Sequence, residues 1–377
     1  MSAKANRRRF WMLLHRWIGV ITFLFIVIAG LTGSAIAFWR DIDSTLNADW
    51  YHVKPAEQRQ TIETLLEIVQ TQFPDSQPYS VVLNDAANAS LIVYLADDPS
   101  GTDAVFINPY NGEILGSRDN EHASIHRRHL MPFLYRLHYS LGLGQLGENV
   151  LGFVALLCLL MTVIGVWLAW PKPKKWRKAL SVKTTAGKAR LMFDLHRAGG
   201  LLLSPFLLVI LWTSLWWNMD YVIRPATDAV SPRTPMFSDT YSVSEPSTHS
   251  NLSIDHAVAL ALKSRPTATA YYVRLMPEKR LYIVYLKMPE DSGPYGRTYA
   301  FINFSGELLH IDEPKNNSLG DSYAEWQLPL HSGQFLGIPG RVVWAVIGVS
   351  PLLFGISGFY LWLRKINIKN TKGGLNV

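Results

Sequence analysis

The chain has 377 residues, of which 49% are hydrophobic, and it carries 13 tryptophans and a formal net charge of +7. Its mean hydropathy is slightly positive, which is too apolar for an ordinary water-soluble protein and too polar for a bundle of membrane helices alone. The basic residues gather beside apolar segments, so membrane topology explains the charge better than nucleic-acid binding does. The single cysteine, Cys158, excludes an intrachain disulfide, a cysteine-rich zinc site, an all-cysteine iron–sulfur cluster and a C-x-x-C-H covalent haem site.

Four apolar segments divide the chain, and each is long enough to cross a hydrocarbon core of about 30 Å. Two long polar stretches and one short one separate them. The predicted organisation is an N-terminal segment with the first transmembrane helix (1–40), an outer domain (41–148), a second transmembrane helix (149–171), a basic loop (172–194), a third transmembrane helix (195–217), a second outer domain (218–338), a fourth transmembrane helix (339–364) and a tail (365–377).

Charge predicts the orientation of these segments. The stretch 171–190 carries eight basic residues and no acidic one, and both ends of the chain are basic as well. Short basic loops stay on the cytoplasmic side of a membrane. We therefore predict that both termini and the basic loop lie in the cytoplasm and that both long polar domains lie outside. A contact of the basic loop with anionic lipid is compatible with this topology.

Each long polar stretch has the pattern of one small helix followed by an antiparallel sheet. In the first, a helical stripe precedes three β-like runs and a turn (58–73, 79–83, 91–95, 104–107 and 108–113). In the second, a helix with Ser253 as its N-cap precedes the same kinds of segment (253–263, 268–275, 281–286, 298–304 and 303–307). We predict two small α+β domains.

The order of span, helix, strands, turn and span thus occurs twice. Residues 107–115 match 302–309 through an Ile-Asn pair and a Gly-Glu turn, and 165–170 match 358–363. Because each half starts and ends on the same side of the membrane, we expect two parallel repeats related by an axis along the membrane normal.

A histidine stands at or just before the start of each apolar segment. His15 and His196 occur in Leu-His-Arg steps at the inner ends of their spans, whereas His138 and His331 follow a leucine and precede spans that return inward. A two-fold axis brings equivalent residues together. The predicted pairs are therefore His15 with His196 near the cytoplasmic face and His138 with His331 near the outer face.

Two neutral imidazoles on opposite sides of a flat macrocycle can ligate haem iron axially, and a four-helix frame can hold them. The sequence thus suggests that His15, His196, His138 and His331 bind two non-covalent b-type haems. Several glycines near these positions would admit a large ring: Gly19, Gly142, Gly144, Gly199, Gly200, Gly333 and Gly337. Two other interpretations stay open, namely ligation of a bare transition-metal ion, although no carboxylates accompany these histidines in the spans, and a merely interfacial role for each histidine.

Other polar residues near the spans have two interpretations each. Asp194 could orient the imidazole of His196 or cap a helix. A separate outer cluster contains His122, His126 and His129 with two arginines between them. It could be a solvated basic segment, or it could contact an anionic ligand or a haem propionate.

The Leu-His-Arg openings at 14–16 and 195–197, the Arg-Leu-His step at 136–138 and the Asn-Pro-Tyr-Asn-Gly-Glu turn at 108–113 resemble the PepSY-associated transmembrane family over nearly the whole chain. Members of that family include inner-membrane reductases of ferric siderophores that bind two haems b. The resemblance implies a multi-pass protein of the bacterial inner membrane with two PepSY-like periplasmic domains and the four histidines as haem ligands. The shorter turn at 303–307 departs from the family pattern, so the resemblance does not assign one role to both domains.

The first hypothesis for the function is a haem-dependent oxidoreductase that carries electrons across the membrane and reduces a ferric siderophore or similar chelate. No phosphate-binding loop, dinucleotide fingerprint or nucleophile elbow is present, so electrons would come from a cytoplasmic or membrane donor. One alternative is a membrane-anchored protein whose PepSY-like domains restrain a periplasmic protease or other partner. Another is an iron-chelate permease, for which four spans with few charges make a poor path. The expected partners are membrane lipid, the iron chelate and the electron donor, and no nucleic acid.

Overall fold

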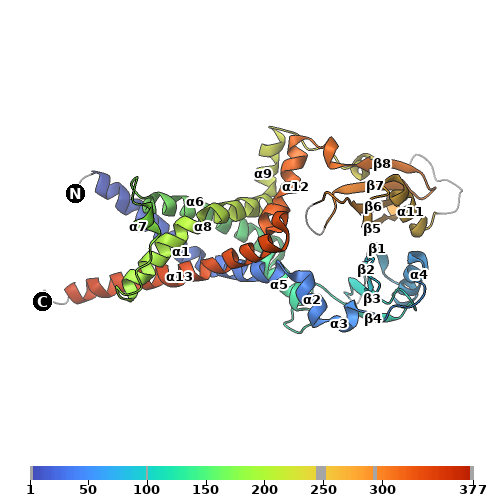
Figure 1. The fold of residues 1–377 in the computed structure, drawn as a ribbon, viewed down its shortest axis with the longest axis horizontal. Coiled ribbons are helices and arrows are strands. Elements are labelled where there is room, and N and C mark those ends of the chain that lie inside the picture. Colours follow the sequence, from blue (N-terminus) through green and yellow to red (C-terminus); the bar gives the residue numbers. More distant parts are fainter. Residues whose placement is uncertain (1–2, 99–100, 243–251, 292–294, 374–377) are drawn as a thin grey trace.

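The computed structural model describes residues 3–98, 101–242, 252–291 and 295–373. It consists of a bundle of long helices with a β-sheet domain at one end (Figure 1). Helix α1 begins and helix α13 ends at the opposite end of the bundle from the sheet. The two parts therefore follow one another along the long axis of the molecule.

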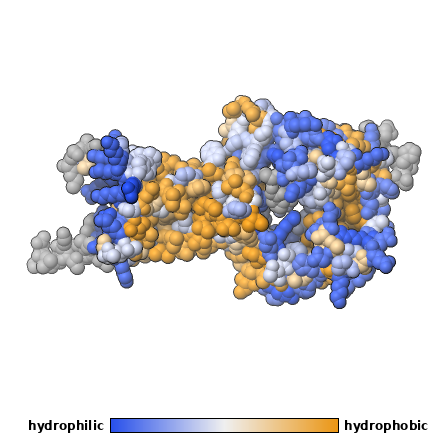
Figure 2. Space-filling view, viewed as in Figure 1, coloured by the Kyte–Doolittle hydropathy of each residue, from blue (hydrophilic) through white to orange (hydrophobic). Residues whose placement is uncertain are grey.

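Four helices form the bundle: α1 (Ala3–Ile36), α6 (Gly144–Ala169), α8 (Lys188–Asn218) and α13 (Gly337–Gly373). Each is long and apolar enough to cross a membrane, as the sequence predicts, and apolar residues cover the middle of the bundle (Figure 2). The helices exceed the predicted spans, because α1 continues through the basic N-terminal residues and α13 runs for 37 residues. Arginine and lysine are good helix formers, so the change to polar composition does not end these helices.

The bundle has a definite arrangement of neighbours. Helix α1 packs against α6 and α13, and α8 packs against the same two helices. Helices α1 and α8 therefore occupy diagonal corners of the bundle. The contact between α1 and α13 requires glycine, because a Cβ on Gly30 would lie 2.3 Å from the carbonyl oxygen of Gly348.

Short helices connect the bundle to the sheet domain or to the basic loop. Those that follow α1 and α8 on the sheet side are α2 (Trp39–Leu46), α3 (Ala48–Tyr51), α9 (Asp220–Asp228) and α10 (Phe237–Thr240). Those that precede α6 and α13 are α5 (Leu130–Ser140) and α12 (Leu319–Ser332). Helix α7 (Trp176–Leu180) lies in the basic loop and packs against α8.

The sheet domain contains one antiparallel sheet rather than two. Its strands, in the order β4-β3-β2-β1-β5-β6-β7-β8, are β4 (Ile114–Arg118), β3 (Ala104–Ile107), β2 (Leu91–Ala96), β1 (Gln77–Val82), β5 (Thr269–Met276), β6 (Leu281–Lys287), β7 (Thr298–Asn303) and β8 (Leu308–Asp312). The prediction of two small domains is thus wrong in one respect: the halves join where Val81 of β1 pairs with Val273 of β5. Without this pairing, β1 and β5 would each be an edge strand with unpaired backbone groups. The pairing of β1 with β5 removes both of these edges. Each half also has a fourth strand, β4 or β8, beyond the three predicted.

The core of this domain lies between the sheet and two helices, α4 (Ile62–Gln72) and α11 (Ile254–Ser264), on the side away from the bundle (Figure 1). Ser253 caps α11 as predicted, because its side chain accepts a hydrogen bond from the backbone N–H of His256. The carboxylate of Asp255 accepts from the first two backbone N–H groups of α4, at 2.8 and 3.0 Å. The second half of the chain therefore also caps a helix of the first half.

A buried ion pair fixes the sheet above helix α1. Asp43 of α2 is fully buried and lies 2.8 Å from the guanidinium of Arg118 in β4. Tyr51 and Asn47 donate further hydrogen bonds to the same carboxylate, at 2.6 and 2.7 Å. Since every partner of a buried charge must be supplied by the fold, this network holds α2 and α3 against the sheet.

Candidate functional site

The structure brings the four predicted histidines together in two pairs. The ring centroids of His15 on α1 and His196 on α8 are 6.2 Å apart, across the diagonal of the bundle. Those of His138, near the end of α5, and His331, near the end of α12, are 5.9 Å apart. The predicted pairing of histidines between the two halves is therefore confirmed.

His15 and His196, called the inner pair after their predicted side of the membrane, have defined hydrogen bonds at Nδ1; His138 and His331 are called the outer pair in the same sense. His15 Nδ1 lies 2.9 Å from the carbonyl oxygen of Met161, which can only accept. His196 Nδ1 lies 2.9 Å from the hydroxyl of Ser357, and that hydroxyl already donates to the carbonyl of Leu353. In both rings Nδ1 must therefore carry the proton and donate it, so Nε2 keeps its lone pair.

The outer pair has the same arrangement. His138 Nδ1 donates to the carbonyl oxygen of Ala29 on α1 at 2.9 Å. His331 Nδ1 lies 2.9 Å from the hydroxyl of Thr213 on α8, which itself donates to the carbonyl of Val209. Burial lowers the pKa of both His138 and His331, so both rings are held neutral with an unprotonated Nε2.

Glycines form the surfaces on which two of these rings rest. A Cβ on Gly165 of α6 would lie 2.8 Å from His15 Cε1, and one on Gly33 of α1 would lie 2.8 Å from His138 Cε1. The sequence predicted that other glycines would admit a large ring. A Cβ on Gly19 or Gly199 would meet a methionine or a phenylalanine, and Gly333 lies in a tight turn. A Cβ on any of the others would meet no atom within 4 Å: Gly142, Gly144, Gly200 and Gly337. Gly33 and Gly165 were missed because they lie on different helices from the rings that they support.

The two pairs lie at different depths. Ala29, which accepts from His138, follows His15 by 14 residues on the same helix. At about 1.5 Å of rise per residue, this places the two pairs about 21 Å apart along α1. One pair therefore lies toward each end of the apolar part of the bundle.

The donor set at each pair fits a metal inside a macrocycle better than a bare metal ion. Within the part of the chain that the structure describes, no group of three or more His, Cys, Asp or Glu side chains could hold a metal. Bare metal ions in proteins take three or four such ligands. With metal–nitrogen bonds of about 2 Å and roughly 1 Å from each nitrogen to its ring centre, two axial imidazoles need centroids about 6 Å apart. Both observed pairs match this spacing.

Asp194 has neither of the roles considered for it. It is the seventh residue of α8, so it is not an N-cap, and His196 uses Ser357 instead. The buried carboxylate pairs with Arg190 at 2.8 Å and Arg197 at 3.0 Å. Arg197 in turn donates to carbonyl oxygens of the basic loop. Asp194 therefore fixes the basic loop beside the inner histidine pair.

The outer histidine cluster is tied to α3. The rings of His122 and His129 are 4.8 Å apart, and Arg127 and Arg128 both bind the carboxylate of Asp49. These arginines lower the pKa of Asp49 to about 2. The arginines of the cluster are thus engaged within the protein. His126 accepts a long contact from the N–H of Arg128 at 3.4 Å.

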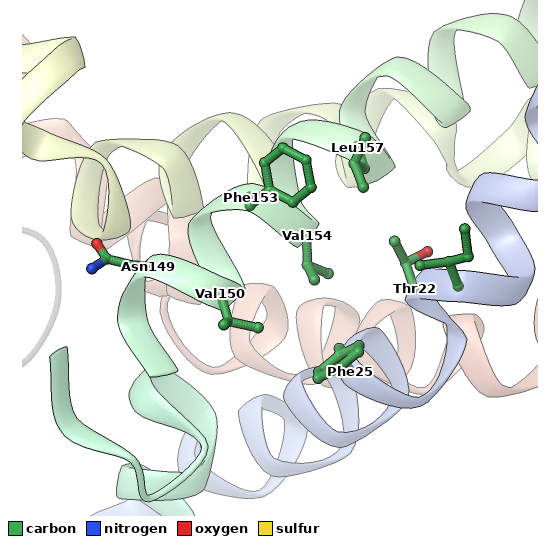
Figure 3. A pocket seen from close by; sticks show the side chains of 8 residues that line it. Thr22, Phe25, Asn149, Val150, Phe153, Val154 and Leu157 are labelled. Atoms are coloured by element: carbon green, nitrogen blue, oxygen red, sulfur yellow. The ribbon is translucent and has the colours of Figure 1, made fainter. Parts of the chain in front are cut away.

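Two cavities lie on the sides of the bundle. One of about 340 Å³ lies between α1 and α6 and is lined mainly by apolar residues such as Phe25 and Phe153 (Figure 3). It lies between the levels of the two pairs and contains no titratable side chain, so we assign it to packing or lipid contact. The other, of about 290 Å³ between α8 and α12, includes Thr213 and Leu330 beside His331.

These features define an integral membrane protein with four apolar helices, two histidine pairs held between them and an antiparallel sheet beyond one end. The chain belongs to the family described as the PepSY-associated TM region, whose profile matches residues 12–365. A comparison with curated proteins found no match.

Proposed function

We propose that this chain is a membrane electron-transfer protein that binds two b-type haems and reduces a ferric chelate, such as a ferric siderophore, on the side where the sheet lies. The observation that supports this most is the shared state of the four histidines: each donates from Nδ1 to a neighbouring helix and keeps Nε2 as a ligand. A haem held by each pair would supply a reversible one-electron carrier at each depth of the bundle. The two imidazoles of each pair would both serve as ligands to such a haem, which would disfavour oxygen activation.

We infer that the chain is a duplication, and this supports the assignment of all four residues together. Thr32 follows His15 by 17 residues, and Thr213 follows His196 by 17. Each of these threonines contacts the outer histidine of its own half, at 3.4 and 2.9 Å. Equivalent positions thus support equivalent rings. In the sheet, strands β1 to β4 follow one another outward on one side of the β1–β5 pair, as β5 to β8 do on the other side.

We further infer that the basic end of the bundle faces the cytoplasm of a bacterium and that the sheet domain is periplasmic. Basic residues near the spans stay on the cytoplasmic side. Hydrophilic residues gather at the end of the bundle away from the sheet (Figure 2), and the segments at that end are rich in arginine and lysine. Electrons from a cytoplasmic or membrane donor would enter near His15 and His196. The chelate would be reduced near His138 and His331.

Reduction across a sealed vesicle tests this function. Haem-loaded protein is reconstituted with a ferric chelate and an Fe(II)-specific dye inside, and a membrane-impermeant reductant is added outside. We expect Fe(II) inside with the wild-type chain, and a rate at least about tenfold lower with His196→Ala, because removal of one axial ligand disrupts the inner site. Equal rates for the two proteins would contradict the proposal, as would passage of the intact ferric chelate out of the vesicles without reduction.

A further inference from the structure

One face of the sheet carries a set of tyrosines that the histidine pairs do not explain. Tyr272, Tyr285 and Tyr299 are direct neighbours across β5, β6 and β7, and successive ring centroids are 4.9 Å apart. In the adjacent row, Ser80 of β1 pairs with Tyr94 of β2 on one side and with Arg274 of β5 on the other. Side chains two residues apart on a strand share a face, so Arg274 lies on the face of Tyr272.

This tyrosine face, made of Tyr94, Tyr272, Tyr285, Tyr299 and Arg274, is the face turned toward the bundle. Val273 and Val284, which alternate with its members, belong to the core under α4 and α11, and those helices lie on the far side of the sheet from the bundle (Figure 1). Its tyrosines are partly exposed, and residues of connecting helices pack at its two ends. Trp50 of α3 packs on Phe106 at one end, and Phe237 of α10 packs on Phe301 at the other.

Arg40, whose charge acts on Tyr94 of this face, adjoins aromatic residues that extend to the outer histidine pair. The guanidinium of Arg40, at the start of α2, lies 5.2 Å from the ring centre of Tyr295. Trp39, the preceding residue, contacts Tyr135 of α5 at 5.5 Å, and Tyr135 contacts Tyr139 at 4.9 Å. Tyr139 adjoins His138 in the chain. A ligand on the tyrosine face would therefore lie at the end of the bundle that holds the outer pair, and not at the end that holds the inner pair.

The charge and polarity of this face indicate the kind of ligand. Arg40 and Arg274 are both exposed, and among the described residues neither has a carboxylate within ion-pair distance. Burial raises the pKa of Tyr94, Tyr285 and, to about 12, of Tyr299, so these phenols remain neutral donors. Arginines without a carboxylate partner favour an anion, and tyrosine rings favour a ligand with aromatic surfaces.

We propose that the tyrosine face is the binding site for an anionic ferric chelate with aromatic arms, of the tris-catecholate type. The two arginines match its negative charge, the rings stack on its arms, and the phenol hydroxyls donate to its oxygens. The inference rests on the proposed function for the idea that a ferric chelate is the substrate. What is new is the location of the site on the tyrosine face and its preference for aryl, anionic ligands over neutral hydroxamates.

Equilibrium dialysis of the oxidised, full-length chain in detergent tests this site. The probes are the ferric complexes of 2,3-dihydroxybenzoate and of acetohydroxamate, and bound iron is counted. We expect the aryl complex to bind at least about tenfold more tightly. Arg274→Gln should weaken its binding about tenfold, since a hydrogen bond to a charged group is lost. Tyr272→Leu should weaken it by about fivefold through the lost ring contact.

Lys263→Gln on α11 is the matched control, because it removes the same charge from the opposite side of the sheet, and it should bind like the wild type. Thermal unfolding and haem content identify a variant that fails to fold, and Tyr272→Phe retains the ring if Tyr272→Leu does not fold. Equal affinity for the two complexes, or unchanged binding by Arg274→Gln, would overturn the site. Because dialysis requires no electron transfer, failure here with a successful vesicle assay would reject the site alone.

Discussion

At the residue scale, the proposed function depends on which nitrogen of each imidazole carries the proton. Thr213 and Ser357 donate their own hydroxyl protons to carbonyls of their own helices, which forces the neighbouring imidazoles to donate from Nδ1. The sequence predicted the four histidines and their pairing, because they recur in repeated Leu-His contexts. It could not predict Thr213 or Gly33 as partners, since nothing in the order of residues shows which helices touch.

Thr213→Val removes the hydroxyl that orients His331 while keeping a β-branched side chain of similar size. Loss of such a supporting hydrogen bond typically costs tenfold to a hundredfold in metal affinity, so we expect haem affinity at the outer site to fall by about that factor. Spectroscopic titration with haem measures it. Thr213→Ser keeps the hydroxyl and should bind haem normally. An unchanged titration of Thr213→Val would show that this contact does not support the ring.

At the element scale, the predicted spans and helices exist but the predicted sheet differs. Periodicity located α4 and α11 to within a few residues, because each has an apolar stripe that covers the sheet. Periodicity could not show that β1 and β5 pair, because the bonds between them join backbone groups of strands far apart in the chain. The long basic extension of α1 was missed because hydropathy indicates which residues cross the membrane and not where a helix begins.

Asp103, just before β3, carries a pH-dependent contribution to the stability of the sheet. Burial raises its pKa to about 6, although Asn120 donates two hydrogen bonds to it. A raised carboxyl pKa means that the folded state binds the proton more tightly, so stability falls as pH rises from about 4 to about 6. Asp103→Asn keeps the acceptor oxygen and removes the charge.

We expect Asp103→Asn to stabilise the protein by about 1 kcal/mol at pH 7.5 and to have little effect at pH 4.5; the figure is kept low because the side chain is only half-buried. Thermal unfolding at both values measures this. Asp85→Asn, exposed in the loop after β1, is the control for the change of net charge. The same gain at both pH values would show that the carboxyl of Asp103 is not the cause.

At the scale of the whole molecule, the two halves of the chain meet in both parts of the protein. The halves meet at β1 and β5 in the sheet, and they meet again at the two histidine pairs in the bundle. The sequence repeat predicted that equivalent residues would meet, and this located both pairs. It did not indicate the tyrosine face, because that face exists only once β2, β1, β5, β6 and β7 lie side by side.

The haem content of double variants tests whether each haem is held by one histidine from each half of the chain. If each haem is held by one histidine from each half, the wild-type chain binds two haems, and His15→Ala combined with His196→Ala still binds one, because both changes affect the same site. His15→Ala combined with His138→Ala should bind none. The pairing would be contradicted if His15→Ala combined with His196→Ala lost both haems. It would also be contradicted if His15→Ala combined with His138→Ala kept one haem.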